Sequence, residues 1–298
     1  MDINIIGVPL FYGCDKPGVD LGPNTLRENG LVNIFSKNHN VNDLGNIFIN
    51  NVNTNDKFIH SKKMKYLNEI VDANELLANS VWNSLKNDKF PLVIGGDHAL
   101  ALGSVAASGE FYKDDYAVIW VDAHGDLNTE NTTPSGNVHG MPLAASMGLG
   151  DNDLTSIFSK SQKVSMKNVF ILGARDLDQG ELDLIKSNNL NVWTMKAIKE
   201  KGLDACINEV LDIINKKNIN NIHLSFDIDS IDPSFVPGTG TPVDDGLTLE
   251  GGKKIISSLF MTKKVKSMDF VEFNPLLDSN DTCLNSCLSL LNTISNSL

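Results

Sequence analysis

The chain is poor in cysteine and in positive charge, and it contains no long apolar run. Its four cysteines among 298 residues are too few and too scattered for a disulfide framework. The 25 Lys and Arg against 37 Asp and Glu give a net charge of −12, which argues against nucleic acid as a partner. No stretch approaches the roughly 20 apolar residues of a membrane span, and no basic segment opens a secretory signal. These absences predict a reduced, cytoplasmic protein without nucleic-acid or membrane partners.

Short β-rich runs alternate along the chain with longer segments of helical spacing. The runs predict strands at 4–8, 91–94, 116–121, 168–172, 190–194, 221–226 and 265–271, with a weaker one at 45–50. The spacing predicts helices at 61–85, 98–108, 180–187, 197–215, 248–260 and 280–295, the last with Cys283 and Cys287 on its buried face. Continuous apolar strands are typical of parallel sheets covered on both faces. The sequence therefore predicts one α/β domain over residues 1–298.

Acidic residues and histidines follow three of these predicted strands. The clusters are Gly-Gly-Asp-His at 95–98, Asp-Ala-His-Gly-Asp-Leu-Asn at 122–128 and Asp-Ile-Asp-Ser-Ile-Asp-Pro at 227–233. Ligands of open parallel sheets bind beyond the carboxyl ends of the strands. We therefore expect the three clusters to meet at one edge of the sheet. Asp97 and Asp232 are the exceptions, because their positions are those of a helix cap and a turn residue.

The chemistry of the combined clusters indicates a metal site. At least five carboxylates in one crevice cannot all stay ionised near pH 7 without cations between them. Alternate residues of an extended segment point the same way, so Asp122 and His124 form one pair, and Asp227 and Asp229 form another. With His98 and Asp126 these pairs supply six ligands, enough for two metal ions. Oxygen ligands with a minority of imidazole suit Mn²⁺ or another hard divalent ion, and the lack of thiolates disfavours structural zinc.

The same motifs resemble those of the ureohydrolases, the family of the arginases and agmatinases. The resemblance runs from Gly-Val-Asp-Leu-Gly-Pro at 18–23 through the three clusters to Gly-Thr-Gly-Thr-Pro at 238–242 and Glu-Phe-Asn-Pro at 272–275. It implies a three-layer α/β/α fold with an eight-stranded parallel sheet and two Mn²⁺ ions. One ion would take His98, Asp122, Asp126 and Asp227. The other would take Asp122, His124, Asp227 and Asp229.

Within that family, the loop 128–140 resembles the arginase version. The resemblance implies that Asn128 and Ser135 receive the substrate α-carboxylate, and it assigns Asn137 of the same loop to substrate binding. It implies further that Asp178 receives the α-ammonium with Glu181 nearby, that Thr241 lies by the guanidinium, and that Glu272 pairs with it. Local chemistry offers competing interpretations, since loops select Ser and Asn, and acidic residues cap helices.

The activity implied is hydrolysis of L-arginine to L-ornithine and urea by a hydroxide that bridges the two metals. Asp126 would hydrogen-bond to this hydroxide and pass its proton to the leaving amine, while His139 would exchange protons with solvent. Two alternatives stay open, an agmatinase or other guanidino-compound hydrolase and a non-catalytic metal-binding regulatory protein. The chain is similar to the compact bacterial arginases, which implies a homo-oligomer, a hexamer or a trimer. Asp244 and Asp245 depart from the family pattern, with an effect on affinity that the sequence leaves undetermined.

Overall fold

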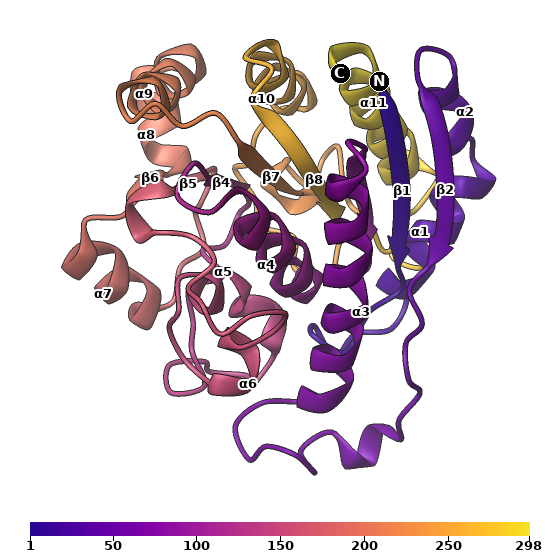
Figure 1. Ribbon diagram of the computed structural model, residues 1–298, viewed down its shortest axis with the longest axis vertical. Coiled ribbons are helices and arrows are strands. Elements are labelled where there is room, and N and C mark those ends of the chain that lie inside the picture. The colour runs from indigo at the N-terminus through magenta and orange to yellow at the C-terminus, as the bar shows by residue number, and fades with distance from the viewer.

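A computed structural model describes residues 1–298 as eight strands in a single parallel sheet with helices on both sides (Figure 1). The strands are β1 (Asp2–Val8), β2 (Asn40–Asn46), β3 (Phe90–Gly95), β4 (Ala117–Val121), β5 (Val169–Leu172), β6 (Asn191–Trp193), β7 (Ile222–Asp227) and β8 (Val265–Val271). Their order in the sheet is β2-β1-β3-β8-β7-β4-β5-β6, and every neighbouring pair is parallel. The predicted eight-stranded parallel sheet is therefore confirmed.

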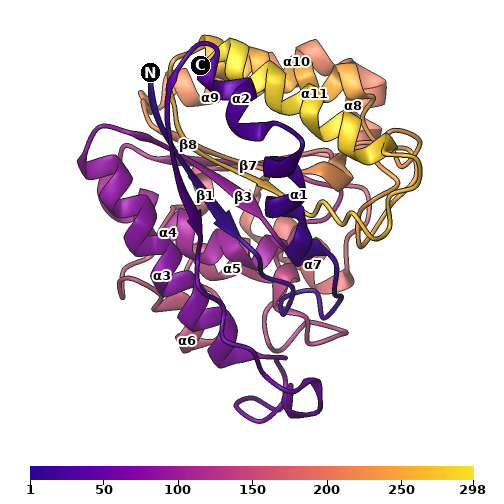
Figure 2. The same ribbon diagram turned by 90° about the vertical axis from the view of Figure 1, so that its right-hand side faces the viewer.

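Two helical layers enclose the sheet, as the view along it shows (Figure 2). One layer holds α1 (Gly22–Glu28), α2 (Leu31–Ser36), α8 (Met195–Lys201), α9 (Leu203–Lys216), α10 (Leu249–Met261) and α11 (Thr282–Ser297). The other holds α3 (Leu67–Lys86), α4 (Ala101–Tyr112), α5 (Pro142–Ser146) and α6 (Asn152–Thr155), with α7 (Gln179–Asn188) packed beside it. The arrangement is the expected three-layer α/β/α fold. No helix has both the length and the apolar character needed to cross a membrane.

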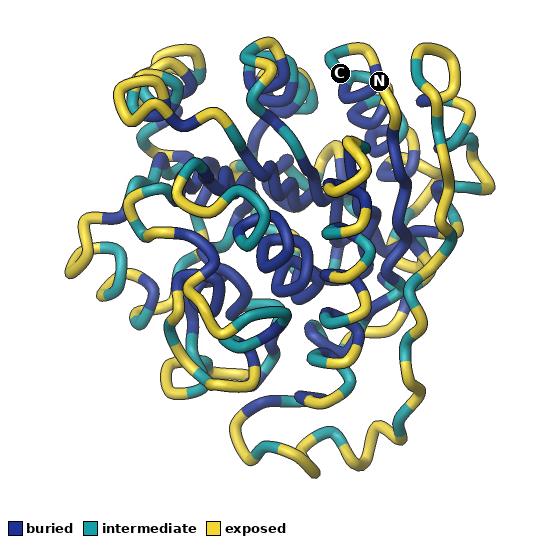
Figure 3. Tube along the Cα trace, in the orientation of Figure 1, coloured by how far each residue is buried: buried dark blue, intermediate teal, exposed yellow.

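The sequence of β4 shows why the strands read as continuous apolar runs. Ile119 and Val121 pack into the core beneath α9, α10 and α11, whereas Val118 and Trp120 pack into the core beneath α4 and α5. All five residues of this strand are buried, and the neighbouring central strands β3, β7 and β8 are almost wholly buried too (Figure 3). A strand covered on both faces has no solvent side, so its sequence does not alternate.

Several element boundaries differ from those predicted. The weak strand expected at 45–50 lies instead at Asn40–Asn46, where polar residues pair with the open edge of β1. The helix expected at 197–215 is divided into α8 and α9 at Gly202, whose φ of 90° does not fit a helix. The helix expected at 61–85 begins only at Leu67, and the short helices α1, α2, α5 and α6 were not predicted. All four cysteines are unpaired, and Cys283 and Cys287 are buried on α11 as expected.

The strand order brings distant parts of the chain together. β7 and β8 lie between β3 and β4, although they come more than 100 residues later in the sequence. The carboxyl ends of β3, β8, β7 and β4 therefore stand next to one another. Ligands of open α/β sheets bind at such an edge, where the connections that follow neighbouring strands run to opposite sides of the sheet.

Candidate metal centre and cavity

The three clusters predicted from the sequence meet at this edge. His98 lies just beyond β3, Asp122 and His124 just beyond β4, and Asp227 and Asp229 at the end of β7. They form two groups whose ligand atoms lie within 4.8 Å of one another. One group is His98, Asp122 and Asp227, and the other is Asp122, His124 and Asp229.

The first group has the chemistry of a cation site. His98 Nδ1 lies 3.0 Å from Asp122 Oδ2, 3.2 Å from Asp126 Oδ2 and 3.2 Å from Asp227 Oδ2. This nitrogen is buried, and it has no hydrogen-bond partner. The other ring nitrogen, Nε2, lies 2.8 Å from Ser225 Oγ, which itself donates to Asp269 Oδ2 at 3.4 Å. If Nε2 donates along this chain, the lone pair of Nδ1 faces three carboxylates, an arrangement that a metal cation satisfies.

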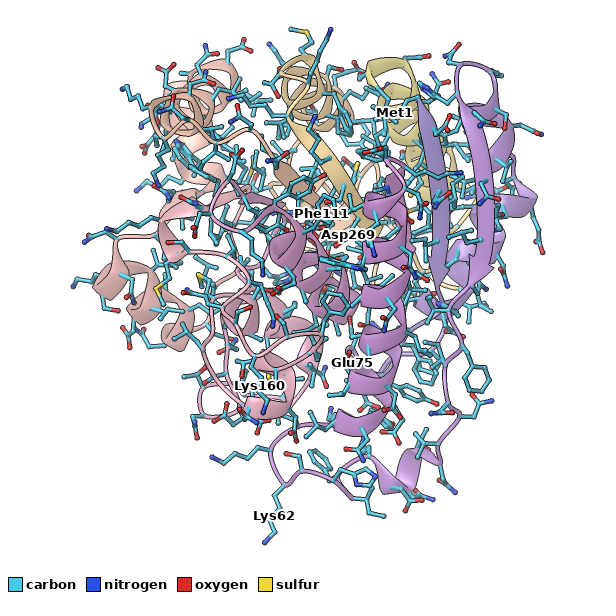
Figure 4. The ribbon with its side chains drawn as sticks, viewed as in Figure 1. Met1, Lys62, Glu75, Phe111, Lys160 and Asp269 are labelled. Carbon is cyan, nitrogen blue, oxygen red and sulfur yellow. The ribbon has the colours of Figure 1, made fainter.

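Asp269, which accepts at the end of this chain, is fully buried inside the molecule (Figure 4). Its Oδ2 also accepts a hydrogen bond from Ser104 Oγ at 2.6 Å and lies 2.9 Å from His223 Nε2. His223 is thus a hydrogen-bonded core residue and takes no part in the metal groups. A network of polar side chains inside the sheet therefore orients the ring of His98 from below.

The second group shares Asp122 with the first. His124 Nδ1 lies 3.1 Å from Asp229 Oδ2 and 3.4 Å from Asp122 Oδ1. Because Asp122 turns one oxygen toward His98 and the other toward His124, it is placed to bridge two ions. Trp120 Nε1 donates to Asp122 Oδ2 at 2.9 Å and fixes that carboxylate. Asp227 belongs to the first group alone in this arrangement, so its expected bridging role stays a prediction.

Crowding of negative charge is visible in the ionisation of the carboxyls. Burial, together with the charges of Asp229 and Asp122, raises the pKa of Asp227 well above its usual range. Burial and the neighbouring Asp122 also raise the pKa of Asp126 to about 6. Both effects penalise the ionised form, which two divalent cations would restore.

Two carboxylates of the centre have left-handed backbone conformations. Asp126 has a φ of 51° and Glu272 a φ of 70°, which side-chain-bearing residues adopt rarely. The carbonyl of Asp126 accepts the N–H groups of Leu143 and Ala144 at the start of α5, and the N–H of Glu272 donates to Gly96 O. These bonds hold conformations that cost on the order of 1 kcal/mol or more each, a pattern found at functional sites.

Glu272 connects the metal centre to His139. Its Oε1 accepts the backbone N–H of His98 at 2.9 Å and lies 3.2 Å from His139 Nδ1. Its Oε2 is buried without a partner. Burial lowers the pKa of His139, but Glu272 and then Asp126 outweigh this effect and raise it above the ordinary value. His139 is therefore held, with a raised pKa, beside a carboxylate whose second oxygen has no partner.

A cavity of about 120 Å³ opens above the two groups, and no hydrophobic residue lines it. All six residues predicted to bind substrate line this cavity: Asn128, Ser135, Asn137, Asp178, Glu181 and Thr241. His98, His124, Asp126, His139, Asp227 and Asp229 line it as well. Asp122 and Glu272 are almost fully buried, and they lie outside this lining. The structure thus brings every predicted site residue to one place.

Asp178 and Glu181 differ in what they can offer a ligand. Glu181 accepts the N–H of Leu127 at 2.9 Å with one oxygen and the N–H of Asp178 at 2.8 Å with the other. Burial raises the pKa of Glu181 to about 7. Asp178 accepts from Asn128 Nδ2 at 2.7 Å. Asp178 is therefore the N-cap of α7 and Glu181 its N3 residue, so both cap the helix as local chemistry predicted. Glu181 also fixes Asp178 and the loop that carries Asn128.

Three polar residues around the cavity were not predicted from the sequence. Thr133 and Asp176 line it, and Asp176 Oδ2 lies 3.9 Å from His124 Nε2. Lys65 Nζ donates to Asn137 Oδ1 at 2.7 Å from outside the loop. Thr133 lies within the recognised loop 128–140, and Asp176 lies two residues before Asp178, so both positions were close to predicted site residues. Lys65 belongs to a segment about 70 residues earlier, and no local pattern connects it to the loop.

Asp97 and Asp232, predicted as a helix cap and a turn residue, both accept backbone N–H groups. Asp97 accepts three backbone N–H groups, from Gly13, Cys14 and Ala99, and caps the turn that carries His98. Asp232 accepts the N–H groups of Ser234 and Gly246. Asp244 and Asp245 are exposed and do not line the cavity, and Asp245 pairs with Lys199 at 2.9 Å. Their departure from the family pattern therefore leaves the cavity lining unchanged.

Comparisons with known proteins agree with this geometry. The sequence profile of the Arginase family matches residues 1–294. An arginase of Brevibacillus brevis is 42% identical to the chain, over 98% of this chain and 97% of that protein. The crystal structure of arginase from Bacillus subtilis is 39% identical, covers 98% of this chain and 97% of its own, and superposes with a TM-score of 0.91.

A structure of Entamoeba histolytica arginase in complex with L-ornithine is 34% identical. It superposes with a TM-score of 0.89 over 98% of both chains. A match of this extent covers every element that carries the metal groups and the cavity. The chain therefore belongs to the arginase family.

Proposed function

We propose that the protein is an arginase that hydrolyses L-arginine to L-ornithine and urea with two Mn²⁺ ions. The observation that carries this proposal is the pair of carboxylate and imidazole groups that share Asp122 at the floor of a cavity that no hydrophobic residue lines. The Entamoeba structure supports the substrate class, since it holds L-ornithine and shares the fold. One sheet spans the chain from Asp2 to Val271, which supports a single catalytic domain over residues 1–298.

The donor set favours manganese. The two groups offer mainly carboxylate oxygens with one imidazole each, the combination that suits Mn²⁺ and similar hard ions. We assign His98, Asp122, Asp126 and Asp227 to one ion and Asp122, His124, Asp227 and Asp229 to the other. Bound there, the pair would supply a shared water acidified to hydroxide near neutral pH.

Residues around the metal centre bind the substrate guanidinium and transfer protons. The free Oε2 of Glu272 is the negative group that pairs with the substrate guanidinium, which stays charged at all ordinary pH values. Asp126 Oδ2, which faces both His98 and the cavity, takes the proton of the attacking water and delivers it to the departing amine. His139 then exchanges protons between this site and solvent.

The opposite end of the cavity suits the amino-acid part of arginine. Asp178 is the carboxylate that receives the α-ammonium, held in place by Asn128 and Glu181. Ser135, which is exposed at the rim, and the amides of Asn128 and Asn137 offer hydrogen bonds to the α-carboxylate. Thr241 donates to Asp229 Oδ2 at 3.2 Å, so it links the metal group to the guanidinium end.

We propose further that the protein works in the cytoplasm as a homo-oligomer, a trimer or a hexamer. The resemblance to compact bacterial arginases supports this assembly, and the four unpaired cysteines fit a reducing compartment. The net charge of −12 supports the absence of a nucleic-acid partner. Light scattering coupled to gel filtration measures the assembly directly, and a monomer at working concentration would refute this part.

The decisive experiment measures urea release from L-arginine and from agmatine after Mn²⁺ reconstitution, with a chelated control. We expect activity on arginine that Ser135→Ala reduces, because the α-carboxylate loses a donor. Ser187→Ala, a change at an exposed serine on α7, is the matched control and leaves activity intact. Activity on agmatine alone would identify an agmatinase and refute the assignments of Asn128, Ser135 and Asp178. Absence of turnover on both substrates with metal bound would point to another guanidino substrate or to a non-catalytic protein.

A further inference from the structure

Arginine is scarce in this chain. Of its 25 Lys and Arg residues only two are arginines, Arg27 and Arg175. Arg27 uses the planar guanidinium fully, because it binds both oxygens of Asp43 and also Gly45 O and Asn46. A lysine offers three donors from a single point and cannot replace such a fork. Arg175 is the other position where all three guanidinium nitrogens donate hydrogen bonds.

The guanidinium of Arg175 binds five backbone carbonyls, and no carboxylate lies among its hydrogen-bond partners. Nη2 donates to Asp229 O and to Val243 O, each at 2.7 Å. Nε donates to Asp244 O at 3.0 Å, and Nη1 donates to Ser230 O at 3.3 Å and Gly173 O at 3.4 Å. The group therefore joins its own loop to the segment that carries Asp229 and to the loop that follows Thr241.

The backbone of Arg175 makes a second connection. Its N–H donates to Ala123 O at 2.7 Å, and Ala123 lies between Asp122 and His124. The N–H of Ala123 in turn donates to Asp229 Oδ1 at 3.1 Å. Both ligands that belong to the second metal group alone, His124 and Asp229, are thus held by segments bonded to Arg175. The imidazole of the first group, His98, draws its support elsewhere, from Ser225 beneath it.

The guanidinium packs tightly against Gly246 on one side, next to the backbone of Asp232. A Cβ added at Gly246 would lie 2.7 Å from Arg175 Nη2 and 2.6 Å from the backbone nitrogen of Asp232. The position of the group is therefore fixed by the loop 243–246 on one side and by the metal-bearing segment on the other. Loss of the guanidinium therefore removes the bonds that tie these two segments together.

We propose that Arg175 is a positioning residue that sets His124 and Asp229 in place for the second metal ion and leaves the first ion unaffected. The inference rests on the proposed two-ion function. It concerns geometry, because the charge of Arg175 acts in the opposite direction. A cation close to Asp229 and Asp122 repels a metal ion at the same carboxylates.

The opposing signs make the proposal testable with two variants. Arg175→Lys keeps the charge and removes the fork, whereas Arg175→Met removes both and keeps the apolar stem. Positioning predicts weaker binding of one ion in both variants. A role through charge alone predicts unchanged binding in Arg175→Lys and tighter binding in Arg175→Met. Arg27→Lys, at the other arginine and remote from the cavity, is the matched control.

The experiment titrates metal-free protein with Mn²⁺ and follows free and bound ion by electron paramagnetic resonance, with metal analysis for stoichiometry. We expect Arg175→Lys and Arg175→Met to bind one ion like the wild type and the other about 10- to 100-fold more weakly. The spin-coupled signal of a pair would give way to that of a single ion. Arg27→Lys should bind both ions like the wild type.

Three outcomes would overturn the inference. Wild-type binding of both ions by Arg175→Lys refutes it directly, and equal weakening of both ions shows a general structural role. A wild-type protein that binds a single ion overturns the two-ion function and this inference with it. Circular dichroism and thermal unfolding establish that each variant is folded. If Arg175→Met does not fold, the charge-preserving Arg175→Lys decides alone.

Discussion

Replacement of Glu272 by glutamine separates the contribution of its charge from that of its hydrogen bonds. The carboxylate is 1% exposed, and its Oε1 accepts from His98 N–H while Oε2 has no partner in the protein. The amide oxygen of glutamine can keep the bond to His98. What disappears is the negative charge that, in the proposed function, pairs with the guanidinium of the substrate.

The size of the loss follows from the burial of this site. A hydrogen bond to a charged group contributes about 1.5 to 3 kcal/mol, and a buried charge left unpaired adds to that loss. We therefore expect Glu272→Gln to lose about 3 to 4 kcal/mol of transition-state stabilisation. That is a drop of roughly 200- to 1000-fold in kcat/KM for arginine. Urea release under steady-state conditions measures it.

Stability should not follow activity in this variant. Glu272 adds to the burial penalty that raises the pKa of Asp97 to about 6, so its neutralisation relieves a repulsion. We expect an unchanged or higher Tm and a lower pKa for His139, which loses its main charged partner. Glu250→Gln, at an exposed carboxylate on α10, should change neither property. A kcat/KM within tenfold of the wild type, or a Tm lowered by more than about 5 °C, would refute this reasoning.

Three further predictions concern stability. Because burial raises the pKa of Glu181 to about 7, the folded protein holds its proton more tightly than the unfolded chain. The free energy of unfolding of metal-free wild type, relative to Glu181→Gln, should therefore fall as pH rises from about 4.5 to 7, and urea denaturation at both pH values checks the sign. Removal of Mn²⁺ by a chelator should lower the Tm, since ion at about 1000 times its Kd stabilises by about 4 kcal/mol; an unchanged Tm would contradict the metal site. Leu290→Ala, fully buried on α11, should cost about 2 to 5 kcal/mol in denaturant unfolding, whereas Leu276→Ala, which is 67% exposed, should stay within about 0.5 kcal/mol.

The sequence was most informative where strand ends carry chemistry. His98, Asp122 and Asp227 follow apolar runs, and parallel strands bring their carboxyl ends to one edge, so their proximity could be predicted. The order of the strands could not, since no local pattern shows that β7 and β8 lie between β3 and β4. The edge strand β2 shows the same limit. Its sequence Asn-Val-Asn-Asp-Leu-Gly-Asn has little β propensity, and the open edge of β1 decides its conformation.

The supporting residues were harder to predict than the ligands. The Arg175 guanidinium donates to backbone carbonyls of residues 54 to 69 positions later. Every residue has a backbone carbonyl, so the side-chain pattern does not show which ones Arg175 contacts. Lys65 reaches Asn137 from a segment that extends away from the body of the molecule, where Lys62 marks its outer end (Figure 4). Such contacts follow from the tertiary fold, so they become visible only when the segments are placed in space.

The position of β7 and β8 between the earlier strands β3 and β4 has a consequence for folding during synthesis. A chain growing on the ribosome completes β3 at residue 95 and β4 at residue 121, but the strands that join them end only at residues 227 and 271. Until then the two halves of the sheet have unpaired inner edges, which makes the nascent chain prone to aggregate. His98 and Asp122 meet only after nine tenths of synthesis is complete. Metal binding at this centre is therefore expected only late in synthesis. A chain that binds the metal already has its last strand, β8, in place.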